Sequence, residues 1–265
     1  MNIIKNKKNI FLISMIIFLL YIFHLKYFNN NYFNQINTTN KLKHIGIIMD
    51  GNRRWAKLNK KTQEIGYKIG ADTAINLIDT FIEENIEEVT LYALSKDNFE
   101  KRTKEELNII FNIAFNTFEN KKDWLIQKGI SLNVIGQIQR LNNDQQKKIN
   151  DLIDATKNGK ILKINILFVY DYLDEIVDLV NNVNIDYKNK KINLNDLNNY
   201  FHKKNIHPVD YLIRTGNVNR ISGFIPIQIG YAEIKFLDIY WPEMNSNILK
   251  KCIKEYRSIQ RNFGK

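Results

Sequence analysis

The segment 50–55 combines residue types that bind phosphate. It directly follows an apolar run and reads Asp50, Gly51, Asn52, Arg53, Arg54 and Trp55. A glycine lets the backbone approach a ligand closely, and the first amide groups of a helix that starts here would point at an anion. The two guanidinium groups add charge-assisted hydrogen bonds, whereas phosphate would repel the Asp50 carboxylate unless Mg²⁺ lay between them. Taken by itself, the segment also fits a solvated Asp-Gly turn.

A second polar group follows the apolar run 210–215. Arg214, Arg220 and Ser222 supply two fixed cations and a hydroxyl, which are groups that a phosphorylated ligand needs. An arginine pair at this spacing also occurs in surface ion-pair groups. The pattern alone therefore leaves both interpretations open.

The elements that must position these residues alternate between strand and helix patterns. Short apolar runs of strand type cover 44–49, 88–94, 131–136, 161–170, 210–215 and 234–241. Helices are expected over 71–84 and 103–127, with two more opening at Asn143 and Ser246. The alternation predicts a single α/β domain with a mostly parallel central sheet flanked by helices, whose ligands bind at the carboxyl ends of the strands.

Two of the expected helices carry an apolar face. Thr103 and Glu106 form the pattern of a capping box and open the helix 103–127. Phenylalanines at helical spacing on this helix fit either a core face or the wall of an apolar channel. The apolar positions of the two helices are Ala71, Ala74, Ile75, Ile78, Phe81, Ile82, Leu107, Ile110, Phe111, Ala114, Phe115 and Phe118.

Length and charge narrow the class of protein. The chain has 265 residues, 44% of them hydrophobic, and a formal net charge of +11, which favour one globular domain with an appendage and anionic partners. Charge does not choose among nucleic acid, phosphorylated small molecules and lipid headgroups, and the Lys-rich composition also fits genome bias. The single cysteine, Cys252, excludes an internal disulfide and a cysteine-based zinc site.

The N-terminus predicts a membrane-targeting segment. Residues 10–25 are almost wholly apolar and follow Lys5, Lys7 and Lys8. No small-residue cleavage site follows, so a retained anchor helix is favoured over a cleaved signal. Residues 26–42 are Asn-rich and read as a tether. The expected organisation is a hydrophobic anchor or signal with its tether at 1–42 and a single folded domain at 43–265.

Five segments resemble, in order, the motifs of the cis-prenyltransferases, the family of undecaprenyl and dehydrodolichyl diphosphate synthases. They are HIGIIMDGNRRWAK (44–57), GYKIGA (66–71), LYALSKDNF (91–99), IRTGNVNRISGF (213–224) and GYAEIKFLDIYWPE (230–243). The resemblance covers about 44–264. It implies an enzyme that condenses isopentenyl diphosphate onto an allylic diphosphate such as farnesyl diphosphate, with a long polyprenyl diphosphate growing in an apolar product tunnel.

The resemblance also implies a role for each matching residue. Asp50 and Glu233 would hold Mg²⁺, and Asn98 would act with Asp50 at the reacting centre. The allylic diphosphate would contact Gly51, Asn52, Arg53, Arg54, Trp55, Tyr67 and Lys101. Isopentenyl diphosphate would contact Ser95, Phe99, Arg214, Arg220 and Ser222.

Some positions depart from the family's pattern. Phe99 stands for a Trp, and Lys101 for an Arg that neighbouring Arg102 could replace. Gln63, Tyr67, Leu173 and Asn219 also depart from it. Arg53 and Val218 resemble the eukaryotic dolichol branch. That branch implies dehydrodolichyl diphosphate as product and the endoplasmic reticulum membrane as location, with an organelle reached by a cleaved signal as the alternative.

Two rival functions are weighed against an enzyme. A non-catalytic partner subunit of the same family would lack the residues that stand here as Asp50 and Arg54. A nucleic-acid binder would need interleaved aromatic residues or a Gly-rich loop, which the sequence lacks, so no nucleic-acid partner is expected. The resemblance implies a homodimer or a heterodimer with a related subunit.

Overall fold

The computed structural model describes residues 41–187 and 206–260. Leu42–Tyr256 form one compact unit. The expected anchor at 10–25, nearly all of the expected tether and the tail from 261 lie outside the described residues. Within the described ranges, no helix is long and apolar enough to cross a bilayer.

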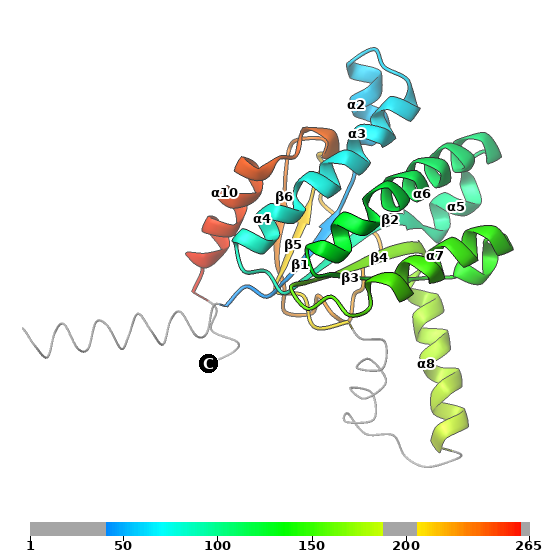
Figure 1. Cartoon of the computed structure of the whole chain (residues 1–265). Coiled ribbons are helices and arrows are strands. Elements are labelled where there is room, and N and C mark those ends of the chain that lie inside the picture. The colour runs from blue at the N-terminus through cyan, green and yellow to red at the C-terminus, as the bar shows by residue number, and fades with distance from the viewer. Residues whose placement is uncertain (1–40, 188–205, 261–265) are drawn as a thin grey trace, which may run out of the picture. The chain divides into compact units, whose positions relative to one another are not determined.

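A six-stranded sheet forms the centre of this unit (Figure 1). Its order is β3-β4-β2-β1-β5-β6, and every neighbouring pair is parallel. The strands are β1 (His44–Ile48), β2 (Glu88–Ser95), β3 (Ile130–Ile135), β4 (Leu162–Tyr170), β5 (Tyr211–Arg214) and β6 (Glu233–Phe236). The first five expected strands are confirmed within two residues at each end, because buried β-branched and leucine runs fix them.

Helices cover one face of the sheet. α3, α6 and α7 pack side by side in front of it in Figure 1. The described helices are α2 (Asn52–Leu58), α3 (Gln63–Asn76), α4 (Ile78–Glu83), α5 (Lys96–Lys101), α6 (Lys104–Gln127), α7 (Asn143–Thr156), α8 (Tyr172–Tyr187) and α10 (Ser246–Arg257), with short 3₁₀ turns η1 (Ile138–Arg140) and η2 (Trp241–Glu243).

The opposite face carries a smaller apolar core. The segment 206–232 contributes Ile206, Val209, Phe224, Ile225 and Ile229, which pack with residues of the strands. Tyr172, the first residue of α8, packs against the edge of this cluster.

Several boundaries differ from the sequence-based expectation. The helix expected at 71–84 is two helices, α3 and α4, that meet at Leu77. The last strand ends at Phe236, because Trp241 belongs to the turn η2. Thr103 caps α6 as expected, since its hydroxyl accepts a hydrogen bond from the Glu106 amide. The other half of the expected capping box does not form, because the Glu106 carboxylate bonds Tyr67 instead.

Two caps lie one residue earlier than expected. The side chain of Asn142, not Asn143, caps α7 by accepting a hydrogen bond from the Gln145 amide. The side chain of Asn245, not Ser246, accepts hydrogen bonds from the amides of residues 247 and 248 at the start of α10. An asparagine outside the helix can reach these free amides, whereas one inside the first turn cannot.

Candidate active site

A cavity of about 670 Å³ lies at the carboxyl ends of the central strands. It sits beside β1, where the strand order reverses, which is where open parallel sheets bind their ligands. Its walls include Asp50, Gly51, Asn52, Arg53, Arg54, Tyr67, Tyr92, Ser95, Asp97, Asn98, Arg102, Ile110, Tyr170, Asp171, Tyr172, Arg214, Arg220 and Ser222.

Asp50 is held between two guanidinium groups at the centre of this cavity. Its Oδ1 accepts a hydrogen bond from Arg54 Nη2 at 2.8 Å, and its Oδ2 accepts one from Arg214 Nη2 at 2.9 Å. The Asp50 amide donates to Thr215 Oγ1, whose hydroxyl donates back to the Asp50 carbonyl. The ends of β1 and β5 therefore fix the carboxylate in place.

Two glycines permit this arrangement. Gly216 has φ +99°, and a Cβ there would lie 2.7 Å from Arg54 Nη2 and 2.9 Å from Asp50 Cγ. Gly51 has φ +112°, and its Cβ would lie 2.6 Å from the Tyr240 ring. That ring also stacks under the Arg54 guanidinium. Other residues would be strained at both positions and would displace the ion-pair group.

Arg214 links Asp50 to the loop 216–223. Only 4% of its side chain is exposed, and Nη1 donates to Ser222 Oγ at 2.8 Å and to the Arg220 carbonyl. Nε is buried and has no hydrogen-bond partner in the part of the chain that the structure describes. The loop thus brings the two arginines and the serine to one wall, as the sequence predicts.

A second carboxylate organises the opposite wall. Glu106, on the first turn of α6, accepts a hydrogen bond from Tyr67 Oη at 2.5 Å. It also lies 3.5 Å from Arg53 Nη1 and 3.5 Å from Arg102 Nε. The Arg102 guanidinium stacks over the Tyr67 ring. Burial, the largest cause, and the bond to Glu106 raise the pKa of Tyr67, so its hydroxyl stays protonated and acts as a donor.

The structure brings eleven of the expected site residues to the cavity wall. They are Asp50, Gly51, Asn52, Arg53, Arg54, Tyr67, Ser95, Asn98, Arg214, Arg220 and Ser222. Ser95 has a second task there, because its Oγ caps α5 by accepting a hydrogen bond from the Asn98 amide.

Lys101 does not line the cavity. Its side chain is 73% exposed and pairs with Asp97 one turn earlier on α5. Arg102 lines the cavity instead, because the helix ends there and the extended backbone at this residue turns the side chain inward.

Three further expected residues lie outside the cavity wall. Phe99 packs with Phe111 in the core, and Trp55 is half-buried on α2. Glu233 is the first residue of β6 and pairs with Tyr211, three residues before the carboxyl edge, or roughly 10 Å from it. Within one chain, Glu233 therefore does not reach Asp50.

Several residues that line the cavity were not predicted from the sequence. Tyr92, Tyr170, Asp171 and Tyr172 line it from the ends of β2 and β4. Burial is the largest cause that raises the pKa of Tyr92 and of Tyr170, so both hydroxyls remain donors. Their position near the carboxyl ends of predicted strands could have indicated this role, because parallel sheets bind ligands at those ends.

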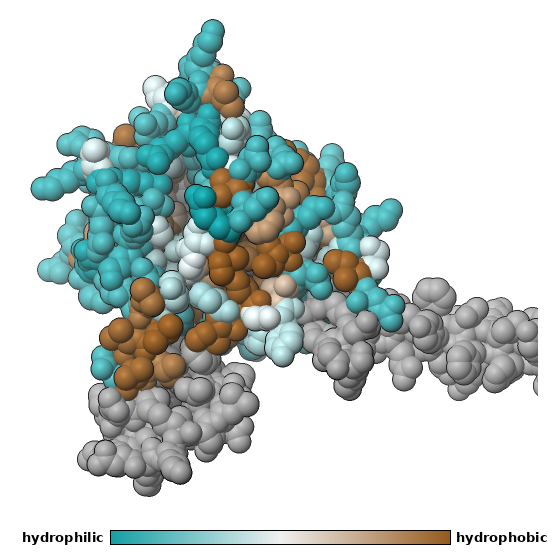
Figure 2. All heavy atoms as spheres, turned by 180° about the vertical axis from the view of Figure 1, so that it is seen from behind, coloured by the Kyte–Doolittle hydropathy of each residue, from teal (hydrophilic) through white to brown (hydrophobic). Residues whose placement is uncertain are grey.

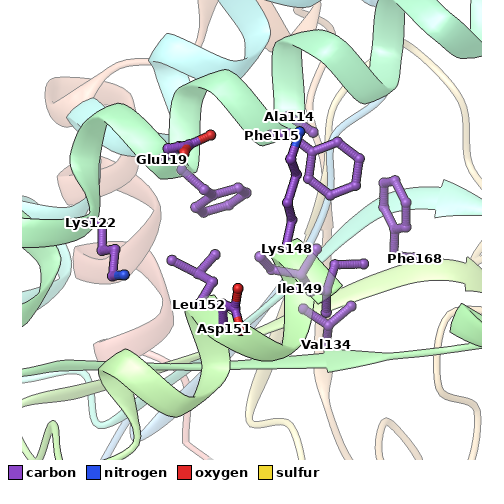
Figure 3. Close-up of a pocket in the computed structure, with 12 residues that line it drawn as sticks. Ala114, Phe115, Glu119, Lys122, Val134, Lys148, Ile149, Asp151, Leu152 and Phe168 are labelled. Atoms are coloured by element: carbon purple, nitrogen blue, oxygen red, sulfur yellow. The ribbon is translucent and has the colours of Figure 1, made fainter. Parts of the chain in front are cut away.

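A smaller cavity of about 150 Å³ lies between α6, α7 and the sheet (Figure 3). Phe115, Leu152, Ile149, Val134 and Phe168 point toward one another in it. Charged side chains, Glu119, Lys122, Lys148 and Asp151, line its rim. The helix α6 contributes to both cavities, with Ile110 in the larger one and Ala114 and Phe118 in the smaller one.

The described residues hold no group of three or more histidines, cysteines or carboxylates that could bind a metal by themselves. A single fixed carboxylate beside cationic groups instead fits Mg²⁺ that is shared with substrate phosphates, since this ion is commonly bound through one or two carboxylates plus phosphate and water. Asp50 is the residue placed for that role.

The fold and this site define an α/β enzyme with an anion-binding cavity at its sheet edge. The family model described as "Putative undecaprenyl diphosphate synthase" matches residues 48–264. An isoprenyl transferase of Rickettsia typhi is 37% identical over 224 residues, which cover 84% of this chain and 98% of that protein. An isoprenyl transferase of Campylobacter jejuni is 34% identical over 226 residues, covering 85% and 100% of the two chains.

Solved structures agree with this match. A "probable undecaprenyl diphosphate synthase" from Campylobacter jejuni superposes with a TM-score of 0.71 at 30% identity, over 84% of this chain and 99% of that one. Lavandulyl diphosphate synthase from Lavandula x intermedia shares the fold, with a TM-score of 0.79 at 24% identity, over 86% and 100% of the two chains. The chain belongs to the cis-prenyltransferase family and is a prenyl transferase.

Proposed function

We propose that this enzyme condenses isopentenyl diphosphate onto an allylic diphosphate, with farnesyl diphosphate as starter, and makes a long-chain polyprenyl diphosphate. The observation that carries the proposal is Asp50 between Arg54 and Arg214, with cationic groups on both sides of one cavity. Two diphosphates need such a double set of donors. Asp50 holds Arg54 and Arg214 in position, and Glu106 lies beside Arg53 and Arg102. Both carboxylates line up these guanidinium groups for the diphosphates and their Mg²⁺.

The two walls are assigned to the two substrates. Asn52, Arg53, Arg54, Tyr67 and Arg102 would bind the allylic diphosphate, and Arg214, Arg220 and Ser222 would bind isopentenyl diphosphate. Mg²⁺ held at Asp50 would neutralise charge that develops on the leaving diphosphate. Fixed guanidinium groups add to this electrostatic stabilisation, which is the main catalytic term expected here.

The double bond of isopentenyl diphosphate attacks the allylic carbon as the bond from that carbon to its diphosphate oxygen breaks, so diphosphate leaves with the electron pair. One proton of the isopentenyl unit must then leave, and the electrons of its C–H bond form the new double bond. Asn98 lines the cavity but has no basic group. We assign the proton to a diphosphate oxygen, which the cationic walls hold in place.

The smaller cavity supports an assignment of the product path. Ile110, Ala114 and Phe118 lie at spacings of four residues, so they share one side of α6. A prenyl chain that starts in the larger cavity would extend along this side toward Phe115 and Leu152. On this proposal α6 would serve both as a channel wall and as a core face, and the burial of Phe111 supports the core face.

Product branch and location are also proposed. Arg53 and Val218 support a dehydrodolichyl product made at the endoplasmic reticulum membrane, with residues 10–25 as anchor. Bacterial relatives such as the isoprenyl transferase of Rickettsia typhi, which is 37% identical, support an undecaprenyl-like product instead. Mass spectrometry of the polyprenols made by the purified chain decides between them, because the two classes differ in chain length.

A dimer is supported by an exposed apolar surface. Leu173, Ile176, Val177 and Val180 form one stripe on α8, and apolar patches mark this face in Figure 2. Such a stripe is typical of an interface between subunits. The variant Val177→Lys should therefore lower the fraction of dimer in analytical ultracentrifugation.

The test of the function uses purified full-length chain with Mg²⁺, radiolabelled isopentenyl diphosphate and farnesyl diphosphate. We expect label in a polyprenyl product, and a loss of at least a hundredfold in rate for Asp50→Ala. The variant should keep its secondary structure in circular dichroism, but its melting temperature should fall because buried Arg214 loses its carboxylate partner. A chain that makes no product alone, but stimulates a related subunit, would instead be the non-catalytic partner. Near-normal activity of Asp50→Ala would remove the role given to this carboxylate.

A further inference from the structure

The turn between α2 and α3 projects from the edge of the domain, at the top of Figure 1. Residues 57–65 form an unbroken exposed run. Within this run Leu58 is 67% exposed and Ile65 is 38% exposed, although aliphatic side chains of this size are usually covered. We refer to residues 57–68 as the α2–α3 tip.

Four lysines lie within three residues of Leu58 or Ile65 along the chain. Lys57, Lys60, Lys61 and Lys68 are exposed, and Glu64 is the one acidic residue of the tip. None of the four makes a salt bridge with another described residue. Elsewhere in the domain, many lysines are neutralised by carboxylates, among them Lys96 by Asp174, Lys147 by Asp151, Lys235 by Glu255 and Lys250 by Glu83.

The tip is held in shape by its own backbone. The Lys60 amide donates to the Lys57 carbonyl, the Lys61 amide donates to the Ala56 carbonyl, and Thr62 caps α3 by accepting a hydrogen bond from the Ile65 amide. A preformed turn loses little conformational entropy when it binds a partner. The exposed leucine and the lysines are therefore presented together and need no folding step.

We propose that the α2–α3 tip docks on the surface of a bilayer that carries anionic headgroups. The unneutralised lysines would meet the headgroups, and Leu58 and Ile65 would enter the boundary between headgroups and acyl chains. Exposed aliphatic residues beside unneutralised lysines fit this partner better than nucleic acid, which would stack on exposed aromatic rings. Tyr67, the one aromatic residue of the tip, is half-buried at the cavity wall.

This docking would act close to the cavity. α2 begins with Asn52 and Arg53 at the cavity wall and ends with Leu58 on the tip, roughly 9 Å away along the helix axis. The tip would thus hold the mouth of the cavity near the bilayer, independently of residues 10–25 and of the reaction that the cavity performs.

The experiment measures contact between the tip and the bilayer directly, because residues 10–25 are expected to bind vesicles as well. Full-length Leu58→Cys is labelled with an environment-sensitive fluorophore. Cys252, the only native cysteine, is buried and its thiol pKa is raised chiefly by burial, so the reagent selects position 58. Vesicles of phosphatidylcholine, with or without 30% phosphatidylglycerol and with nitroxide-labelled lipid, are then added.

We expect quenching at position 58 with the phosphatidylglycerol vesicles and little with neutral ones. In Lys57→Glu/Lys60→Glu/Lys61→Glu the quenching at saturating lipid should fall to the level seen with neutral vesicles, since each lysine near an anionic surface contributes about a factor of five to binding of the tip. The matched control reverses three exposed lysines elsewhere, Lys160→Glu/Lys251→Glu/Lys254→Glu, and should leave the quenching unchanged.

Three outcomes would overturn the proposal: no quenching at position 58, equal quenching with neutral vesicles, or an equal loss in the control variant. The rate of the first condensation with soluble substrates, measured in the same preparations, should be unchanged in both triple variants. A failure of the docking proposal is thus separate from a failure of the proposed activity.

Discussion

The carboxylate of Asp50 and the guanidinium of Arg214 lie 2.9 Å apart, although 164 residues separate them along the chain. They meet because β1 and β5 are parallel neighbours, with Ile48 paired to Arg214, so both residues reach the same edge of the sheet. Arg214 is buried, whereas Arg220 reaches the cavity from the exposed loop. The two arginines should therefore differ in their effect on catalysis.

Arg220→Ala should raise the KM for isopentenyl diphosphate roughly ten- to a hundredfold, because one or two charge-assisted contacts are lost, and should leave kcat nearly unchanged. Arg214→Ala should raise the same KM and also lower kcat at least tenfold, because Asp50 and Ser222 lose the group that positions them. Steady-state kinetics with each substrate varied in turn measures both effects. If either variant raised the KM of the allylic substrate as much as that of isopentenyl diphosphate, the two diphosphate sites would be assigned wrongly.

Gly216→Ala should lower activity by about two orders of magnitude. Alanine at φ +99° costs about 1 to 3 kcal/mol, and its Cβ would displace Arg54 from Asp50. Turnover and the melting temperature are measured together. Gly230→Ala is the matched control, because a Cβ there meets only the Ile227 carbonyl at 3.6 Å and no unusual φ is required. Full activity of Gly216→Ala would contradict the need for close approach at this turn.

Ala114→Leu should shorten the products. The larger side chain would fill part of the 150 Å³ cavity and stop the growing chain early, while the first condensation should change less than about twofold. Chain lengths are read by mass spectrometry. Asn116→Leu introduces the same side chain on the exposed side of α6 and should leave product length unchanged. An unaltered product distribution in Ala114→Leu would place the tunnel elsewhere.

Stability should fall as the pH drops below about 6.5, because His44 is buried as the neutral form. Burial is the main cause that lowers its pKa, and Glu88 and Asp210 oppose the shift. Its ring nitrogens contact Thr90 Oγ1 and the carbonyls of His207 and Pro208. Below its unfolded pKa of 6.5 the unfolded chain binds a proton that the folded chain resists, so folding loses up to about 1.4 kcal/mol per pH unit.

Urea unfolding between pH 7.5 and pH 5 measures this dependence. His44→Asn cannot titrate there but can still donate to the two carbonyls, so it should be less stable overall and show a flatter pH dependence. An unchanged slope in His44→Asn would mean that another group causes the loss.

The sequence by itself determined the parallel sheet and the residues at its carboxyl edge. The run 161–170 is apolar apart from Lys163 and Asn165, which is typical of a strand buried on both faces. The polar residues that follow β1 and end β5 are fixed by the chain itself. Asp50, Arg53, Arg54 and Arg214 were predictable for this reason. A residue at the end of a central strand cannot lie far from the ligand site.

The tertiary structure decided what depends on helix ends and on distant partners. Arg102 reaches the cavity in place of Lys101 because α5 ends at Lys101, and the extended backbone at Arg102 turns its side chain inward. Glu106 organises one wall of the cavity through its contacts with Tyr67, Arg53 and Arg102. The spacing of these residues along the chain does not predict that they lie together. Glu233 lies at the amino end of β6, away from the cavity, because the register of β6 against β5 pairs it with Tyr211. That register depends on packing between strands far apart in the sequence, so the motif alone does not predict it.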